Sequence, residues 1–240
     1  MVVKPFTVDL DKPLVFQVGH LGEAYNEWVH QPIVSKEGPR FFANDYLELL
    51  TRTAWWVIPL VWLPVASWLV SMSFRMGLTL AQVPLAVVGG IFIWTLLEYG
   101  LHRFPLHMKS TSYWLGNTIH YRFHGCHHRH PMDGMRIVFP PAVTAILCVP
   151  FWNMSRLLSP PSVAPALFGG TLLGYVAYDV THYYLHHGKP YKRLTQDLKK
   201  YHLNHHFRNH SKGFGITSSF WDNVFRTVPS TKTAEKMSNQ

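Results

Sequence analysis

Ten histidines in four clusters constrain this chain more than any other feature of its sequence. The clusters have the spacings H-x4-H, H-x2-H-H, H-x3-H and H-x2-H-H, and they comprise His102/His107, His124/His127/His128, His182/His186 and His202/His205/His206. On an α-helix, positions i, i+3 and i+4 lie on one face, so we expect each H-x2-H-H cluster to aim three imidazoles at one point. Imidazole binds zinc, copper, iron and nickel. Ten ligands exceed what one ion accepts, so the pattern predicts two metal ions.

The remaining histidines are interpreted differently, because a lone histidine is more often a structural or surface residue than a ligand. His20 and His30 stand apart from the clusters and fit that description. Four others adjoin a cluster, and we expect them to support ligands from outside or to lie on the surface: His120, His130, His187 and His210. Cys126 lies two residues after His124, off the ligand face of a helix, so we interpret it as a packing residue.

The composition indicates a membrane protein. Hydrophobic residues make up 48% of the 240 residues, whereas charged residues make up only 15%, below the share of about 25% in typical soluble domains. The net charge is +9, which by itself is compatible with nucleic acid. Long uncharged stretches make a membrane surface the better partner, and we expect no nucleic acid.

Four stretches are long and apolar enough to be predicted as transmembrane helices: residues 53–72, 80–101, 137–158 and 163–181. Twenty helical residues at about 1.5 Å each span the hydrocarbon core of about 30 Å. The third stretch is the weakest, because it contains Pro140, Pro141 and Arg156. Residues 1–52 are polar and are expected to form a cytosolic segment, with short helices near residues 23–29 and 45–51. The second of these would be amphipathic and rest on the bilayer surface.

The distribution of Lys and Arg predicts the topology. Apart from Arg75 and Arg156, these residues lie before the first span, between the second and third, and after the fourth. The positive-inside rule then places both termini and every histidine cluster in the cytosol. We therefore expect an all-α membrane protein with four spans in two hairpins. A cytosolic helical cap would hold the dimetal site, and residues 53–240 would form one domain.

The chemistry of the clusters favours oxygen activation. They contain no carboxylate, and ten neutral imidazoles leave two divalent ions with a large positive charge. A structural zinc site has four ligands, which does not match this set. A redox-active pair of ions beside a membrane suggests oxidation of an unactivated C–H bond in a lipid chain. Glu98 and Asp179 lie one helical turn before His102 and His182, and we hypothesise that they orient these ligands.

These residues resemble the fatty acid hydroxylase and sterol desaturase superfamily, and most closely its fatty acid 2-hydroxylases, especially the plant type without a fused cytochrome b5. The resemblance covers roughly residues 40–228. It is carried by LEYGLHRF (97–104), HGCHHRHP (124–131), DVTHYYLHHG (179–188), YHLNHH (201–206) and GFGIT (213–217). All ten clustered histidines match the family's ligand positions.

The resemblance implies an endoplasmic-reticulum enzyme with two metal ions, iron for activity and zinc possible in the purified protein. It would use O2 to hydroxylate C-2 of the acyl chain of ceramide or dihydroceramide. Related enzymes share the clusters, so a sphingoid-base C4 hydroxylase, a sterol desaturase and a sterol methyl oxidase remain alternatives. A non-enzymatic metal-binding membrane protein is a more distant one.

Electrons are expected from a separate cytochrome b5 and its reductase. The 52 residues before the first span are too few for a cytochrome b5 domain, and the His-Pro-x-Gly-Gly haem motif is absent. A basic stretch close to two histidine clusters is a candidate docking face, and its members are Lys189, Lys192, Arg193, Lys199 and Lys200.

Overall fold

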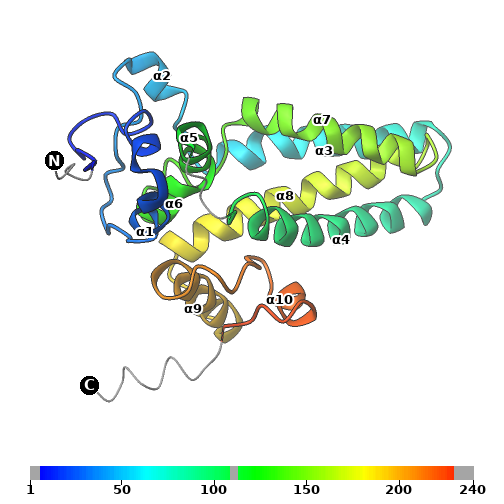
Figure 1. Cartoon of the computed structure of the whole chain (residues 1–240). Coiled ribbons are helices and arrows are strands. Elements are labelled where there is room, and N and C mark those ends of the chain that lie inside the picture. Colours follow the sequence, from blue (N-terminus) through cyan, green and yellow to red (C-terminus); the bar gives the residue numbers. More distant parts are fainter. Residues whose placement is uncertain (1–5, 109–112, 230–240) are drawn as a thin grey trace.

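The computed structural model describes residues 6–108 and 113–229, and in these ranges the chain forms helices and loops without a β-strand. Four long helices run side by side: α3 (Val57–Arg75), α4 (Gln82–Arg103), α7 (Pro141–Leu158) and α8 (Ala164–His187) (Figure 1). The connections α3–α4 and α7–α8 lie at the same end of this bundle, so the long helices form two hairpins. The remaining, shorter helices gather at the opposite end.

Helix α8 is the centre of the bundle, because it packs against α3, α4 and α7. Small residues allow the close approach to α4. A Cβ atom added at Gly170 would collide with the carbonyl oxygen of Val87, and one added at Gly90 would collide with that of Leu167. Such small-residue contacts are typical of helices that pack within membranes.

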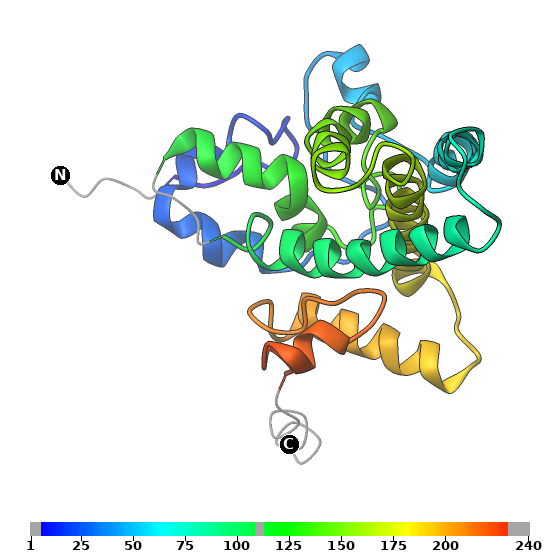
Figure 2. The same ribbon diagram turned by 90° about the vertical axis from the view of Figure 1, so that its right-hand side faces the viewer.

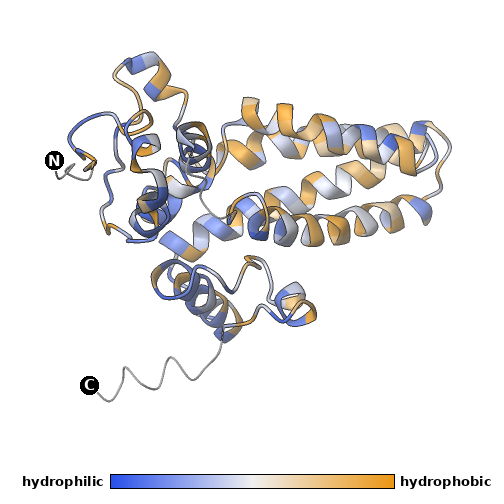
Figure 3. Ribbon diagram, viewed as in Figure 1, coloured by the Kyte–Doolittle hydropathy of each residue, from blue (hydrophilic) through white to orange (hydrophobic). Residues whose placement is uncertain are grey.

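Two of the four predicted spans meet the length and composition expected of a membrane helix, namely α3 and α4. Only 28% of the apolar window in each is buried within the chain, so most of these side chains are at least partly exposed. Figure 3 shows that hydrophobic residues predominate along much of the long helices. Helices α7 and α8 do not meet the same test: α7 contains Arg156 and Asn153, and α8 carries tyrosines, Asp179 and two clustered histidines.

The helix boundaries differ from the predicted spans at specific residues. Helix α7 begins at Pro141, a favoured first position for proline, so residues 137–140 lie outside it. Helix α8 continues beyond residue 181 to His187 and therefore includes a whole histidine cluster. Helix α4 ends at Arg103, two residues before Pro105, as the break predicted at that proline requires.

The short elements form a cap at the histidine-rich end of the bundle. They are η1 (Val18–Ala24), α1 (Tyr25–Val29), α2 (Asp45–Leu49), α5 (Trp114–His120), the π-helical turn η2 (Tyr121–Gly125), α6 (Cys126–Arg129), α9 (Arg193–Phe207) and α10 (Phe220–Val224). Helices α9 and α10 lie below the long helices in both ribbon views (Figures 1 and 2).

The N-terminal segment packs directly on the second histidine cluster. Tyr25, Val29 and Phe41 share one hydrophobic core with Tyr121 and Cys126. Tyr121 lies just before that cluster, and Cys126 lies within it. The interpretation of Cys126 as a packing residue is confirmed by this burial, which also raises the pKa of its thiol to about 12. The N-terminal segment, from residue 6 onward, is thus part of the structure that encloses the histidines.

Candidate metal centre

All ten clustered histidines converge at the cap end of the bundle, and they form two groups of five. The first group consists of His102, His107, His124, His128 and His205. The second group consists of His127, His182, His186, His202 and His206. Within each group, the five candidate ligand nitrogens all lie within 4.8 Å of one another.

The structure corrects the expectation that each H-x2-H-H cluster aims three rings at one point. His124 and His128 belong to the first group, whereas His127 belongs to the second. In the fourth cluster, His205 belongs to the first group and His206 to the second. Consecutive helical residues point about 100° apart, so adjacent imidazoles cannot face one ion. Only the i, i+4 pairs stay together, and each H-x2-H-H cluster contributes to both groups.

The nitrogen spacing in the first group fits one metal ion. The Nε2 atom of His107 lies 3.2 Å from that of His102, 3.1 Å from those of His124 and His128, and 3.0 Å from that of His205. Two imidazole nitrogens bound about 2.1 Å from one ion at a right angle would lie about 3.0 Å apart. The five nitrogens therefore surround a space of the right size for an ion.

The second group has the same spacing and leaves ring nitrogens without partners. The Nε2 atom of His202 lies 2.8 Å from that of His186 and 3.1 Å from that of His206. Both ring nitrogens of His127 and of His182 are buried, and neither has a hydrogen-bond partner in the described part of the chain. Unpaired buried polar atoms are costly, and a metal ion would satisfy one nitrogen of each of these rings. The donor set of both groups thus fits a metal.

Each ligand position follows from a local feature of the backbone. The helix break after Arg103 lets His102 and His107 converge although their i, i+5 spacing would separate them on an unbroken helix. The π-helical turn that contains His124 lies between α5 and α6, and such turns are frequent at functional sites. Helix α8 carries His182 and His186 on one face, and α9 carries the fourth cluster.

Backbone carbonyls orient two rings of the first group from behind. The Nδ1–H of His102 donates to the carbonyl of Phe214 at 2.5 Å, and that of His205 donates to the carbonyl of Lys212 at 2.8 Å. His120 lies beside this group, with its ring centroid 6.4 Å from that of His124. Its two ring nitrogens bond to the hydroxyl of Tyr25 and to the carbonyl of Leu106, each at 2.7 Å.

Glu98 does not contact the ring of His102 in the way that the sequence suggested. One of its carboxylate oxygens accepts the backbone N–H groups of Ile216 and Thr217, both at 2.7 Å. Its other oxygen accepts the hydroxyl of Thr217 at 2.7 Å. Glu98 therefore holds the loop that supplies the carbonyl to His102. Asp179 is buried beside the second group, and its Oδ2 has no hydrogen-bond partner within the described residues.

Sequence reasoning missed the residues around this loop. Phe214 covers the first group, with its ring 5.3 Å from that of His107 and 5.8 Å from that of His205, centroid to centroid. Asp222, fully buried, accepts the backbone N–H groups of Phe214 and Gly215. The available signal was the GFGIT segment, whose paired glycines indicate a tight backbone near the site.

The histidines outside the clusters differ in their distance from the site. His20 is exposed, as expected of a lone histidine. His30 is closer than its isolation in the sequence indicated: its ring stacks on His210, with centroids 3.6 Å apart, and lies 5.1 Å from the ring of His128. His130 is buried, and His187 stacks on Tyr183.

Burial favours the neutral form of seven of the clustered imidazoles. It lowers the pKa of His127 to about 3, and it lowers the pKa of six other imidazoles well below the usual value: His107, His124, His128, His202, His205 and His206. Neighbouring imidazoles add to the effect by repelling a positive charge. Metal binding requires the neutral form of histidine, so these rings are ready to bind without losing a proton.

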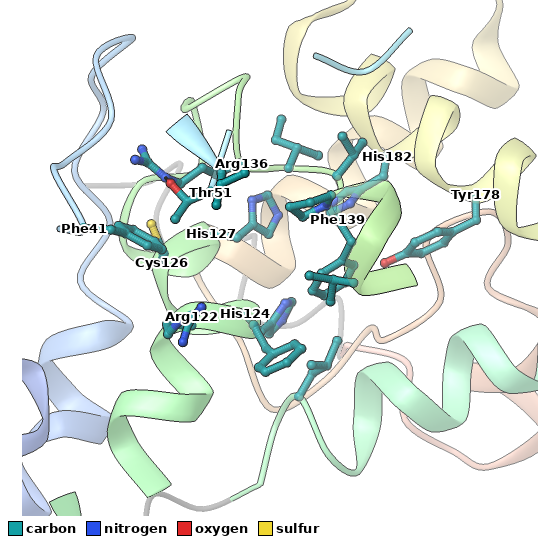
Figure 4. A pocket seen from close by; sticks show the side chains of 17 residues that line it. Phe41, Thr51, Arg122, His124, Cys126, His127, Arg136, Phe139, Tyr178 and His182 are labelled. Carbon is teal, nitrogen blue, oxygen red and sulfur yellow. Dashed lines mark hydrogen bonds between the residues drawn. The ribbon is translucent and has the colours of Figure 1, made fainter. Parts of the chain in front are cut away.

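Three cavities are lined by clustered histidines, and the largest of them, of about 370 Å³, is lined by His107 together with His30 and His210. A second cavity, of about 130 Å³, is almost entirely apolar; it lies between α4, α7 and α8, and His102 is among its lining residues. The third cavity, of about 100 Å³, is lined by His124, His127 and His182, and its lining also includes the polar side chains of Thr51 and Arg122 (Figure 4). Leu106, Phe139 and Tyr178 line both this cavity and the apolar one, so the two cavities are neighbours.

Comparisons with known proteins agree with this site. The model of the fatty acid hydroxylase family matches residues 87–227. The chain is 65% identical over 236 residues to dihydroceramide fatty acyl 2-hydroxylase FAH1 of Arabidopsis thaliana, with 98% of this chain and 99% of that protein covered. It is 43% identical over 230 residues to the ceramide very long chain fatty acid hydroxylase SCS7 of Saccharomyces cerevisiae, with 92% of this chain and 58% of that protein covered.

A solved structure has the same fold. It is described as full-length scs7p with only the hydroxylase domain visible, and it matches with a TM-score of 0.88 at 41% identity. The match covers 95% of this chain and 87% of that chain.

Proposed function

The chain belongs to the fatty acid hydroxylase family, and from this premise we propose that it is a dihydroceramide fatty acyl 2-hydroxylase. It would use O2 to add a hydroxyl group at C-2 of the acyl chain of ceramide or dihydroceramide in sphingolipid biosynthesis. The observation that carries the proposal is the pair of five-imidazole groups, one member of which, His102, lines an apolar cavity.

The ten clustered histidines are the proposed ligands of two metal ions, five to each ion. Iron is the expected working metal, and zinc is an alternative occupant of the purified protein, because imidazole binds both. When bound, the ions supply the activation of O2 that oxidation of an unactivated C–H bond requires. The chain holds nine of the ten rings buried, and it thereby keeps bulk water away from this chemistry.

The two neighbouring cavities provide for the two ends of the substrate. The first carbons of the acyl chain would occupy the apolar cavity, where Leu101, Leu147 and Leu172 offer only hydrocarbon surface. The polar end, with the amide, fits the third cavity, which contains Thr51 and Arg122. C-2 is the first acyl carbon beyond the amide carbonyl. It would therefore lie near Tyr178, which lines both cavities, and close to the histidines of both groups.

We further propose that the protein spans the endoplasmic-reticulum membrane four times, with α3/α4 and α7/α8 as the two hairpins. The outward-facing apolar side chains of α3 and α4 support contact with lipid. Helix α8 needs less apolar character of its own, because its neighbours cover most of its surface. The termini and the cap with its histidines would lie in the cytosol, and residues 53–240 would form the hydroxylase domain.

Electrons would come from cytochrome b5 and its reductase, docking on the basic stretch at the start of α9. Lys189, Lys192, Arg193 and Lys200 are exposed there and available to an acidic partner. Lys199 is not, because its ammonium donates to the carbonyls of His186 and Gly188 and so caps the end of α8.

Expression of the chain in a cell that lacks its own 2-hydroxylase tests the proposal. Mass spectrometry of ceramides should show a hydroxyl group on the acyl chain at C-2. A hydroxyl group on the sphingoid base at C4, or an altered sterol, would assign the chain to another activity of the same superfamily. Metal binding without consumption of O2 would indicate a metal-binding membrane protein that is not an enzyme.

A further inference from the structure

The loop between α9 and α10 forms hydrogen bonds to two rings of the first histidine group through their Nδ1 atoms. As described above, the carbonyls of Lys212 and Phe214 accept the Nδ1–H groups of His205 and His102. A carbonyl can orient a ligand ring only if the carbonyl itself is held in place. The position of residues 212–217 therefore determines how well these two rings face an ion.

Two buried carboxylates from distant parts of the chain hold this loop from both sides. Glu98 of α4 accepts three hydrogen bonds from Ile216 and Thr217. Asp222 of α10 accepts the backbone N–H of Phe214 at 3.0 Å and that of Gly215 at 2.7 Å. The exposed fraction is 4% for Glu98 and 0% for Asp222, so water cannot replace these bonds.

The loop backbone is shaped to reach both carboxylates. Gly213 has a φ of 76°, a left-handed conformation that favours glycine. At Gly215, a Cβ atom would collide with the carbonyl oxygen of Ser218. Glycines at these two positions let consecutive N–H groups turn toward Asp222 and then toward Glu98.

A second chain of hydrogen bonds fixes Asp222 to the helix that carries His102. The hydroxyl of Thr227 donates to Asp222 at 2.7 Å and accepts from the hydroxyl of Tyr99, which lies 2.9 Å away. The guanidinium of Arg103 donates to the Tyr99 oxygen at 2.8 Å. Tyr99 and Arg103 flank His102 on α4, so the loop, Asp222 and the ligand helix form one connected unit.

The second histidine group has no such support in the described part of the chain. The Nδ1 atoms of all five of its members are buried without a hydrogen-bond partner there: His127, His182, His186, His202 and His206. The two groups therefore differ in how their rings are held, although their donor sets are the same.

We propose that Glu98 and Asp222 are positioning residues for the metal ion of the first histidine group alone. They fix the loop whose carbonyls orient His102 and His205, and they do not act on the second group. The inference rests on the two-ion site of the proposed function and adds an asymmetry to it. Loss of either carboxylate lowers the affinity for one ion and leaves the affinity for the other unchanged.

The test uses the purified full-length chain with Asp222→Asn and measures bound zinc at buffered free Zn²⁺ concentrations. The wild type should bind two ions. In the variant, one ion should bind about 10- to 100-fold more weakly, and the other should bind with unchanged affinity. Glu98→Gln should weaken the binding of the same single ion.

Glu48→Gln is the matched control. Glu48 is also buried and also accepts two backbone N–H groups, from Phe41 at 2.8 Å and Phe42 at 3.0 Å, but these belong to the N-terminal segment. This variant should lower the temperature of unfolding while both ions bind as in the wild type. The comparison separates loss of metal orientation from loss of stability alone.

Thr217→Val provides a milder variant that removes only the hydroxyl donor to Glu98 and keeps the side-chain shape. It tests the proposed asymmetry if Asp222→Asn does not fold, and it should weaken the binding of one ion by a smaller factor. Equal weakening of both ions, or unchanged binding of both, would overturn the proposed asymmetry. A wild-type chain that binds fewer than two ions would instead refute the two-ion site.

Discussion

Replacing the adjacent residues His205 and His206 by alanine, separately and together, tests whether the ten histidines divide as described. The Nε2 atom of His205 lies 3.0 Å from that of His107 in the first group. The Nε2 atom of His206 lies 3.1 Å from that of His202 in the second. Each single variant should therefore weaken the binding of a different ion, and the double variant should weaken the binding of both.

The size of the effect follows from the number of ligands. Structural zinc sites in small peptides contribute about 10–16 kcal/mol of binding free energy at neutral pH. If a total of this order is shared by five imidazoles, each ligand contributes about 2–3 kcal/mol. One missing ring should then weaken its ion by about 30- to 150-fold, because about 1.4 kcal/mol corresponds to a factor of ten.

Equilibrium dialysis of the purified chain against buffered Zn²⁺, followed by elemental analysis, measures this effect directly. His20→Ala is the control, since that side chain is exposed and belongs to neither group. Both single variants should also fail to produce 2-hydroxylated ceramide. A double variant that still bound one ion with wild-type affinity would refute the division, because both residues would then serve the same ion.

Three further outcomes are expected. Asp179→Asn should lower metal affinity or turnover by about 10- to 100-fold; unchanged values would leave this carboxylate as a buried structural group. Leu147→Trp should shift the ceramide products toward shorter acyl chains, because the larger ring fills part of the apolar cavity; an unchanged product spectrum would place the chain elsewhere. Lys192→Glu combined with Lys200→Glu should slow reduction by cytochrome b5, more at low than at high salt, whereas activity with a chemical reductant should survive. Equal loss with both electron sources would assign these lysines to folding or lipid contact.

The helical architecture could be predicted because its signals are local. Apolar length indicated α3 and α4, and Pro105 indicated the break that lets His102 and His107 converge. The predictions were less precise for α7 and α8. Helix α8 is enclosed by its neighbours, so its sequence carries more polar groups than a lipid-facing helix tolerates.

The identity of the ten converging histidines was also visible in the sequence, but their division into two groups was not recognised. The same helical geometry that separates His186 from His187 also separates His127 from His128. Applied consistently, it predicts that adjacent histidines serve different ions. An H-x2-H-H cluster then contributes to both sites: its i, i+4 pair belongs to one group and its remaining ring to the other.

The support behind the rings depends on contacts that no local pattern encodes. Glu98 and Thr217 are 119 positions apart, and the carbonyl that orients His102 belongs to residue 214. A carboxylate one turn before a ligand suggested a direct bond to the ring. The folded chain instead places a loop between them, because Glu98 can accept three loop donors and the loop carbonyl can accept the ring N–H. One carboxylate thus holds the loop whose carbonyl accepts from a clustered histidine that the carboxylate does not touch, an arrangement that only the tertiary structure could reveal.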